Sequence, residues 1–108
     1  MDLSKLFEKV EGFDWDKANK DKNWEKHGVK NREAAEVFFN KPLIVNFDKR
    51  YSKNEVRFQT LGRTNENRKL FIVFTIRNNK IRIISARNII KKERRVYEKQ
   101  KTKTNSKV

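Results

Sequence analysis

Cysteine is absent from this chain of 108 residues, and histidine occurs once. Without cysteine there are no disulfide bonds, zinc ribbons or thiol nucleophiles, as is usual in a reducing cytoplasm. The N-terminal stretch MDLSKLFEKVEGF lacks the uninterrupted apolar core of a signal peptide, and no segment approaches the apolar length that crosses a bilayer. We therefore expect a soluble cytoplasmic protein without a membrane partner.

Acidic residues are few: 14 Asp and Glu stand against 28 Lys and Arg, and the formal net charge is +14. A positive field of this size attracts polyanions, so RNA, DNA or an acidic protein is the expected partner. Charge also serves solubility, and it does not distinguish between these partners. The length of the chain allows one domain with a single core.

The beginning of the chain predicts an extension and a short strand. Residues 1–12 carry apolar side chains at helical spacing, so this extension is either a short amphipathic helix or a loosely docked segment. The stretch GFDWD reads as a brief strand with Phe13 and Trp15 on one side. Trp15 and Trp24 are expected in the core beside the first helix.

Two helices are expected next. The first covers residues 16–27, with basic residues at its end and Gly28 as a left-handed cap. The second covers residues 31–40, with Asn31 as its N-cap and Pro42 as the residue that forbids its continuation.

Four segments rich in β-branched and aromatic residues follow the proline: LIVNFD, EVRFQTLGR, KLFIVFTIR and KIRIISAR. Polar turn residues separate them, which indicates antiparallel strands. A last helix is expected over residues 90–100, and a mobile basic tail over residues 101–108. The predicted fold is α+β and compact: an antiparallel sheet of about four strands plus the short N-terminal strand, two N-terminal helices that cover one sheet face, and a C-terminal helix.

The last two strands are joined by Asn78 and Asn79, a pair suited to a two-residue turn with positive φ angles. This turn predicts three cross-strand pairs: Arg77 with Lys80, Thr75 with Arg82, and Phe74 with Ile83. One sheet face then carries apolar side chains for the helices to cover: Ile72, Phe74, Ile76, Ile81 and Ile83. The other face is apolar in its middle and cationic toward the turn, where a polyanion can lie.

Candidate metal ligands do not converge in this sequence. Asp48, Glu55 and Glu66 lie at strand ends or in loops without ligand-like spacing, so neither a metal site nor a cofactor is expected. No elbow motif surrounds a serine, so a hydrolase with a Ser-His-Asp triad is not expected either.

RNA can be cut without a metal, because its 2′-hydroxyl attacks the adjacent phosphorus when a base takes its proton and cations neutralise the phosphorane. Arginine suits that charge, since it stays protonated and binds two phosphate oxygens at once. His27, Tyr97 or a lysine with a lowered pKa can carry the proton. Each candidate has a structural alternative: His27 can cap a helix, Tyr97 can pack, Glu93 can pair with an arginine, and the arginines can be solvated.

Four separated motifs occur in a characteristic order: FDWDKANKDKNWEKHGV, EAAEVF, RF…LG and KIRIISAR…ERRVYE. They resemble the BrnT family of toxins, distant relatives of RelE, over residues 13–98, and the toxin domain would span residues 13–100. The resemblance implies a RelE-like fold and an endoribonuclease toxin of a type II toxin–antitoxin pair that halts translation. It also implies a BrnA-type antitoxin with a ribbon-helix-helix domain, which neutralises the toxin in a hetero-oligomer and links it to operator DNA.

The matching motifs and the cationic face together supply the candidate site. The expected catalytic residues are His27, Arg57, Arg82, Arg87, Glu93 and Tyr97. The expected RNA-binding residues are Lys26, Arg63, Arg77, Lys80 and Arg94. In the leading hypothesis the three catalytic arginines hold the scissile phosphate, while His27 or a neighbouring lysine moves protons. The chain departs from the family pattern at Asn88, Ile89 and Ile90, which leaves the cap of the last helix open.

Two other functions remain open from the sequence. The first is a non-catalytic partner of the antitoxin that acts as a co-repressor, which would bind the antitoxin without being toxic. The second is a plain RNA-binding module, which would bind RNA with a steep salt dependence and leave its length unchanged.

Overall fold

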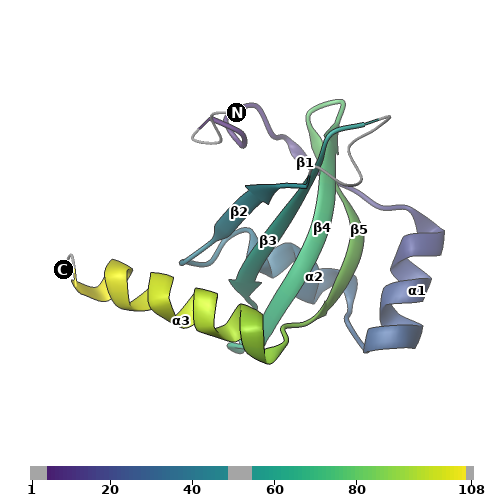
Figure 1. Ribbon diagram of the computed structural model, residues 1–108. Helices are drawn as coiled ribbons and strands as arrows, with labels where there is room; N and C mark the ends of the chain where they lie inside the picture. Colours follow the sequence, from purple (N-terminus) through teal and green to yellow (C-terminus); the bar gives the residue numbers. More distant parts are fainter. Residues whose placement is uncertain (1–4, 49–54, 107–108) are drawn as a thin grey trace.

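Figure 1 shows the computed structural model, which describes residues 5–48 and 55–106. Its strands are β1 (Gly12–Asp14), β2 (Ile44–Phe47), β3 (Arg57–Arg63), β4 (Lys69–Arg77) and β5 (Lys80–Asn88). Its helices are α1 (Lys17–His27), α2 (Asn31–Val37) and α3 (Lys91–Ser106). The strands form one sheet in the order β1-β5-β4-β3-β2.

The predicted α+β fold is confirmed, with one difference: the sheet is mixed. Strands β2 to β5 are antiparallel to their neighbours, whereas β1 runs parallel to β5, with Gly12 opposite Lys80. A hairpin forces an antiparallel alignment, but β1 and β5 are separated by most of the chain. The short strand is therefore free to join the edge of β5 in the parallel sense.

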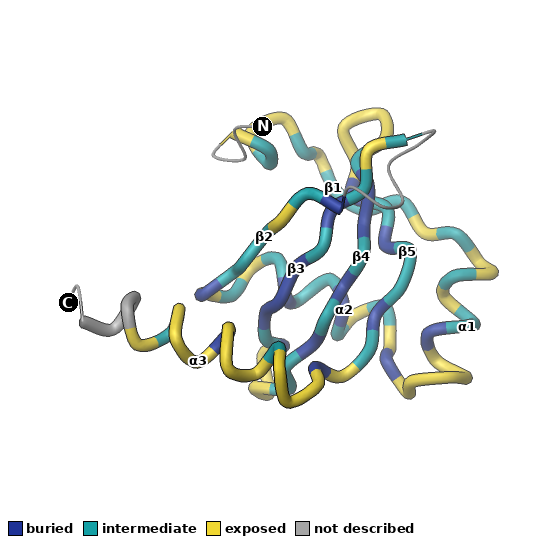
Figure 2. Tube along the Cα trace, viewed as in Figure 1, coloured by how far each residue is buried: buried dark blue, intermediate teal, exposed yellow. Residues whose placement is uncertain are grey.

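The core lies between one sheet face and the segment that contains α2. Four of the five predicted core residues of the hairpin, Ile72, Phe74, Ile81 and Ile83, are buried, and Ile76 near the turn is half-buried. Figure 2 shows these buried stretches in dark blue along β4 and β5. Ala34 and Val37 of α2 are buried against this face. A Cβ at Gly62 would overlap the Val37 side chain, so the glycine lets α2 lie close to β3.

The hairpin follows the predicted register from the turn as far as Phe74. Asn78 and Asn79 have φ angles of 54° and 62°, and the three predicted pairs, including Phe74 with Ile83, are present. The register then shifts, because Val73 pairs with Ser85 and leaves one extra residue in β5. This bulge brings Arg87 opposite Phe71. The sequence pattern did not predict it.

The bounds of α1 are as predicted, and those of α2 are not. Asp16 caps α1 by accepting a hydrogen bond from the Asn19 amide at 3.1 Å, and Gly28 ends the helix at a φ of 61°. The expected N-cap at Asn31 is wrong: Lys30 takes that position, and its amide donates to Glu33.

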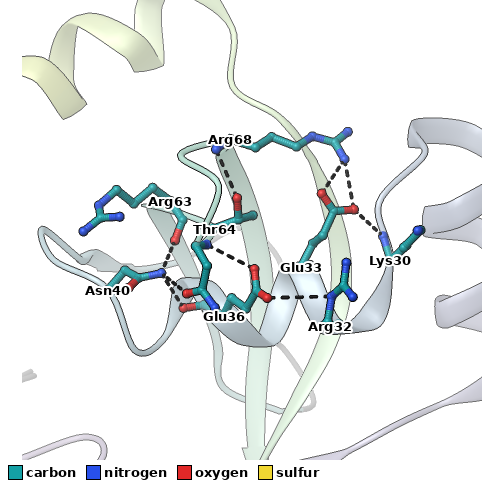
Figure 3. A network of polar contacts seen from close by, with 9 residues as sticks. Lys30, Arg32, Glu33, Glu36, Asn40, Arg63, Thr64 and Arg68 are labelled. Atoms are coloured by element: carbon teal, nitrogen blue, oxygen red, sulfur yellow. Dashed lines mark hydrogen bonds and ion pairs between the residues drawn. The ribbon is translucent and has the colours of Figure 1, made fainter.

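The expected extension of α2 to residue 40 is also wrong. The helix ends at Val37, and the Asn40 side chain donates both to the Glu36 carbonyl and to the Arg63 carbonyl of β3 (Figure 3). A side-chain donor that takes a terminal helix carbonyl replaces the next backbone amide and lets the chain leave the helix.

Helix α1 lies along the edge of β5 that β1 leaves open. Asn23 is the residue of α1 that is buried, and its Oδ1 accepts a hydrogen bond from the Ala86 amide at 3.2 Å. This contact satisfies a backbone amide of an edge strand, which would otherwise need water or another strand.

Of the two alternatives for the N-terminal extension, the short helix is absent from its described part: residues 5–9 form turns, and Phe7 packs on Phe74 with ring centroids 6.0 Å apart. Two further expectations need correction. Helix α3 continues to Ser106, because residues 101–106 contain neither proline nor glycine, so most of the expected mobile tail is helical. Trp15 and Trp24 are 37% and 54% exposed and are not core residues. The predicted features at residues 1–4 and 107–108 lie outside the described residues.

No helix in residues 5–48 and 55–106 combines the length and apolar character of a membrane span.

Candidate functional site

The candidate site lies on the sheet face opposite α2, here called the open face. Arg57 of β3, Thr75 of β4 and Arg82 of β5 are direct cross-strand neighbours, so their side chains form one row across this face. Thr75 is buried, and its hydroxyl donates to the Val56 carbonyl at 2.6 Å. A rigid threonine therefore separates two arginines that come from different strands.

Arg82 connects the open face to the start of α1. Its guanidinium lies 3.2 Å from the carboxylate of Asp16, the same residue that caps the helix. Its Nε is buried and has no hydrogen-bond partner within the described part of the chain. Arg82 thus connects β5 to the N-terminal end of α1.

Arg87 is fixed more tightly than Arg82. Two parallel hydrogen bonds of 2.9 and 2.8 Å join its guanidinium to the Glu93 carboxylate, and its Cζ lies 4.2 Å from the centre of the Phe71 ring. Glu93 also accepts a hydrogen bond from the Ile90 amide, which caps α3 and answers the question that the departure from the family pattern left open. Partial burial opposes ionisation of Glu93, but these hydrogen bonds outweigh it, so the pKa of this carboxyl lies below its ordinary value.

A depression of about 290 Å³ occupies the middle of the open face and is called the central hollow. Its polar lining is cationic with one carboxylate: Lys22, Asp48, Arg57, Gln59, Ser85 and Arg87. Lys22 comes from α1, and Asp48 follows β2 and donates its backbone amide to the Arg57 carbonyl. Three cations and one acid from four parts of the chain therefore converge on one depression.

His27 and Lys26 lie at the exposed end of α1. Lys26 is four residues after Lys22, so it continues the same helix face away from the central hollow. The carbonyls of His27 and Gly28 accept hydrogen bonds of 3.1 and 2.9 Å from the Arg68 guanidinium, which also pairs with Glu33. Figure 3 shows the Arg68 and Glu33 part of this network. A cation near the C-terminal end of a helix interacts favourably with the helix dipole, and Arg68 supplies such a cation at the end of α1 beside His27.

The remaining predicted cations, Arg77, Lys80, Arg94 and Arg63, are not among the residues that line the central hollow. Arg77 pairs with Glu55 at 2.6 Å, and Arg57 lies 3.8 Å from the same carboxylate, so Glu55 bridges two arginines at the turn end of the sheet. Lys80 is exposed at the hairpin turn, and Arg94 is exposed on α3. Arg63 donates to the Lys41 carbonyl at the opposite end of β3.

Tyr97 lies in the interior. Of the two alternatives for this residue, proton transfer and packing, its position is the one expected for packing. It is fully buried with Leu61 and Ile89 under α3, and its hydroxyl has no hydrogen-bond partner among residues 5–48 and 55–106. Burial raises the pKa of Tyr97 above its ordinary value. Its closest link to the site is indirect, since Phe71 packs against the same cluster.

Lys22, Asp48 and Gln59 line the central hollow, but sequence reasoning did not select them. Their types were visible, but their convergence depends on the pairing of β2 with β3 and on the angle of α1 against β5. One signal was present for Asp48: if β2 and β3 form a hairpin, the end of LIVNFD lies beside the start of RFQTLGR.

These features define the chain as a small, basic α+β protein whose mixed sheet packs against α2 on one face and carries a cation-lined hollow beside α3 on the other. The sequence profile of a family described as "Ribonuclease toxin, BrnT, of type II toxin-antitoxin system" matches residues 15–93, which is more than half of the chain. The chain belongs to this family of BrnT ribonuclease toxins, and the resemblance noted in the sequence is confirmed.

Comparison with solved structures agrees with the family assignment. The fold is similar to that of the crystal structure of the Brucella abortus ribonuclease toxin BrnT, with a TM-score of 0.56 and 18% sequence identity. The alignment covers 76% of this chain and 100% of the other, and at this identity the likeness concerns the fold. A search of curated proteins gave no match.

Proposed function

We propose that this chain is an endoribonuclease toxin that cleaves RNA without a metal ion, inhibits translation and growth, and is neutralised by a BrnA-like ribbon-helix-helix antitoxin. The antitoxin would link the toxin to operator DNA. The observation that carries the proposal is the convergence of Lys22, Arg57 and Arg87 on the central hollow of a chain from a ribonuclease toxin family.

The reaction begins when the ribose 2′-oxygen attacks the adjacent phosphorus. A bond forms between these atoms, the bond to the 5′-oxygen of the next nucleotide breaks, and the products are a 2′,3′-cyclic phosphate and a 5′-hydroxyl. Negative charge grows on the phosphorane oxygens, where fixed guanidinium groups stabilise it most. Arg87 suits this role because Glu93 and Phe71 already hold it in one orientation.

The same reaction requires two proton transfers. Asp48 and Lys22 are titratable side chains that line the central hollow together with Arg57 and Arg87. In this mechanism the Asp48 carboxylate takes the proton of the 2′-hydroxyl, and the Lys22 ammonium gives one to the departing 5′-oxygen. The role of His27 in proton transfer stays a prediction. No step needs a metal, because the guanidinium groups carry the compensating charge.

The test is incubation of the purified full chain with defined RNA in EDTA, with and without ribosomes, followed by analysis of the new ends. We expect cleavage with 2′,3′-cyclic phosphate ends, and loss of cleavage in Arg57→Ala. Arg32→Ala is the matched control, because Arg32 is exposed on α2 and pairs with Glu36 on the opposite side of the sheet. RNA that is bound but stays intact under both conditions would identify a plain RNA-binding module. Antitoxin binding without toxicity would identify a co-repressor.

A further inference from the structure

A second depression, here called the α3 hollow, adjoins the central hollow on the open face. It measures about 370 Å³, lies between α3 and the sheet, and shares Gln59, Phe71 and Arg87 with the central hollow. Its volume falls in the range of small-molecule sites, roughly 300–1,000 Å³. An RNA chain whose phosphate lies in the central hollow therefore places the neighbouring nucleotide beside the α3 hollow.

The two hollows differ in charge. Arg87 turns its guanidinium onto Glu93 at the boundary, so the α3 hollow receives a closed ion pair there, and Lys92 is its remaining cation. The walls beyond that pair are largely apolar: Leu61, Phe71, Ile90 and Val96. Ile90 and Val96 are about half exposed, at 53% and 49%. A phosphate gains little from such walls, whereas a flat aromatic base gains apolar contact.

Two side-chain amides stand on the sheet side of the α3 hollow. Asn46 of β2 and Gln59 of β3 are direct cross-strand partners, so their side chains project side by side from the open face. Each amide has a donor and an acceptor group, which is the complement needed to bind the edge of a base. Asn46 lines the α3 hollow alone, whereas Gln59 lines both hollows.

We infer that the α3 hollow binds one nucleobase of the RNA next to the phosphate in the central hollow, with Asn46 and Gln59 reading its edge and Val96 flanking its face. This inference rests on the proposed function, because it places the cleaved phosphate in the central hollow. Protein side chains read single-stranded RNA in this manner, by apolar contact with an unstacked base and hydrogen bonds to its edge. The cleavage preference of the toxin is thereby assigned to β2, β3 and α3.

The test has a binding arm that does not depend on cleavage. Short RNAs with one abasic residue at successive positions are titrated against the full chain, with 2′-deoxyribose at any position where cleavage is observed. One abasic position is expected to weaken binding of the wild type about tenfold, the effect of one lost base contact. In Asn46→Ala and in Val96→Trp, which fills the hollow, that position should matter at most about twofold. Asn19→Ala, an amide on α1, is the control and should behave as the wild type.

The cleavage arm measures preference among randomised RNAs. We expect one preferred base beside the cut, and a fall of about five- to tenfold in that preference in Asn46→Ala, as for one lost hydrogen bond. Cleavage with an unchanged preference in both Asn46→Ala and Val96→Trp would overturn the base site and leave the proposed function intact. Absence of cleavage with position-dependent binding that the variants abolish would support the base site and overturn the proposed catalysis.

Discussion

Arg82 and Arg87 point to the same face of β5, although they are five positions apart along the strand. Arg82 lies opposite Thr75 and Arg87 opposite Phe71, and these two partners are four residues apart on β4. In a regular strand an odd separation puts two side chains on opposite faces. The extra residue of the bulge reverses this alternation. The shape of the candidate site therefore depends on one backbone irregularity.

Deleting Ile84 is expected to remove this irregularity. Without Ile84, Arg82 and Arg87 would be four positions apart, so both would stay on the open face of a regular β5, opposite Thr75 and Phe71. The deletion should therefore leave the free energy of unfolding within about 1 kcal/mol of that of a variant substituted at Ile84. Urea unfolding followed by circular dichroism measures the change. Ile84→Thr is the matched control, since it keeps the residue count. A deletion variant less stable than this control by about 3 kcal/mol or more would show that the residues after Ile84 do not keep these partners.

Arg82→Ala is expected to relieve growth arrest and to reduce RNA cleavage by about 100-fold while the protein stays folded. The loss combines two possible causes, because Arg82 contacts Asp16 as well as the open face. Asp16→Asn separates them: asparagine is an equally good N-cap, but it removes the charge. We expect Asp16→Asn to keep cleavage near the wild-type rate. An equal loss in both variants would assign Arg82 to the positioning of α1, and a fully toxic Arg82→Ala would remove it from the site.

Lys22→Gln is expected to reduce the rate of cleavage by about 100-fold or more, as for the loss of a proton donor. His27→Gln should cause a smaller fall in the rate. His27 is exposed at the C-terminal end of α1 and is not among the residues that line the central hollow. The measurement is a single-turnover rate on a defined RNA across a range of pH. A larger fall in His27→Gln, together with loss of the lower-pH limb of the profile, would assign proton transfer to His27. Unchanged cleavage in His27→Gln would leave this residue with the helix-cap role alone.

The pair of Arg87 and Glu93 should make stability depend on pH in acid. The pKa of Glu93 in the folded chain lies below its ordinary value of 4.5. For a lowered pKa, the stabilisation is complete above the unfolded value and is lost as the pH falls through the folded value. We therefore expect the wild type and Glu93→Gln to differ in free energy of unfolding at pH 7 and to converge as the pH falls below 4.5 and through the folded value.

Glu66→Gln serves as the control for this titration, because Glu66 is exposed in the turn between β3 and β4. Its stability should run parallel to that of the wild type across the same range. A difference between Glu93→Gln and the wild type that persists unchanged at pH 3 would mean that the ion pair is not the source of the stabilisation.

The hairpin shows what a sequence pattern can predict. Asn78 and Asn79 fix a turn of known geometry, and alternation then identifies the core face through Ile83 and Phe74 without further information. The bulge cannot be found in this way, because counting in twos from the turn assumes that no residue is inserted. The prediction that Arg82 and Arg87 act together came from the family resemblance, and the strand periodicity by itself argues against it.

The candidate site was only partly predictable for a related reason. Arg57 and Arg87 stand in recognisable motifs, whereas Lys22 and Asp48 belong to the site only because β2 and α1 are positioned by long-range packing. The exact end of α2 was equally hidden, since it depends on the Asn40 side chain reaching the Arg63 carbonyl of a distant strand. Helix propensity is a property of each residue type and does not describe contacts between distant parts of the chain.

The hydrogen bond from the Ala86 amide to Asn23 has a consequence for how molecules of this protein can associate. Unpaired strand edges are templates on which other chains add strands. On the β5 side, β1 and the Asn23 side chain occupy the edge between them, so sheet extension there would require α1 to detach. The other edge is β2, which is four residues long. A short edge gives an incoming strand few hydrogen bonds, so the sheet is poorly suited to growth by strand addition in either direction.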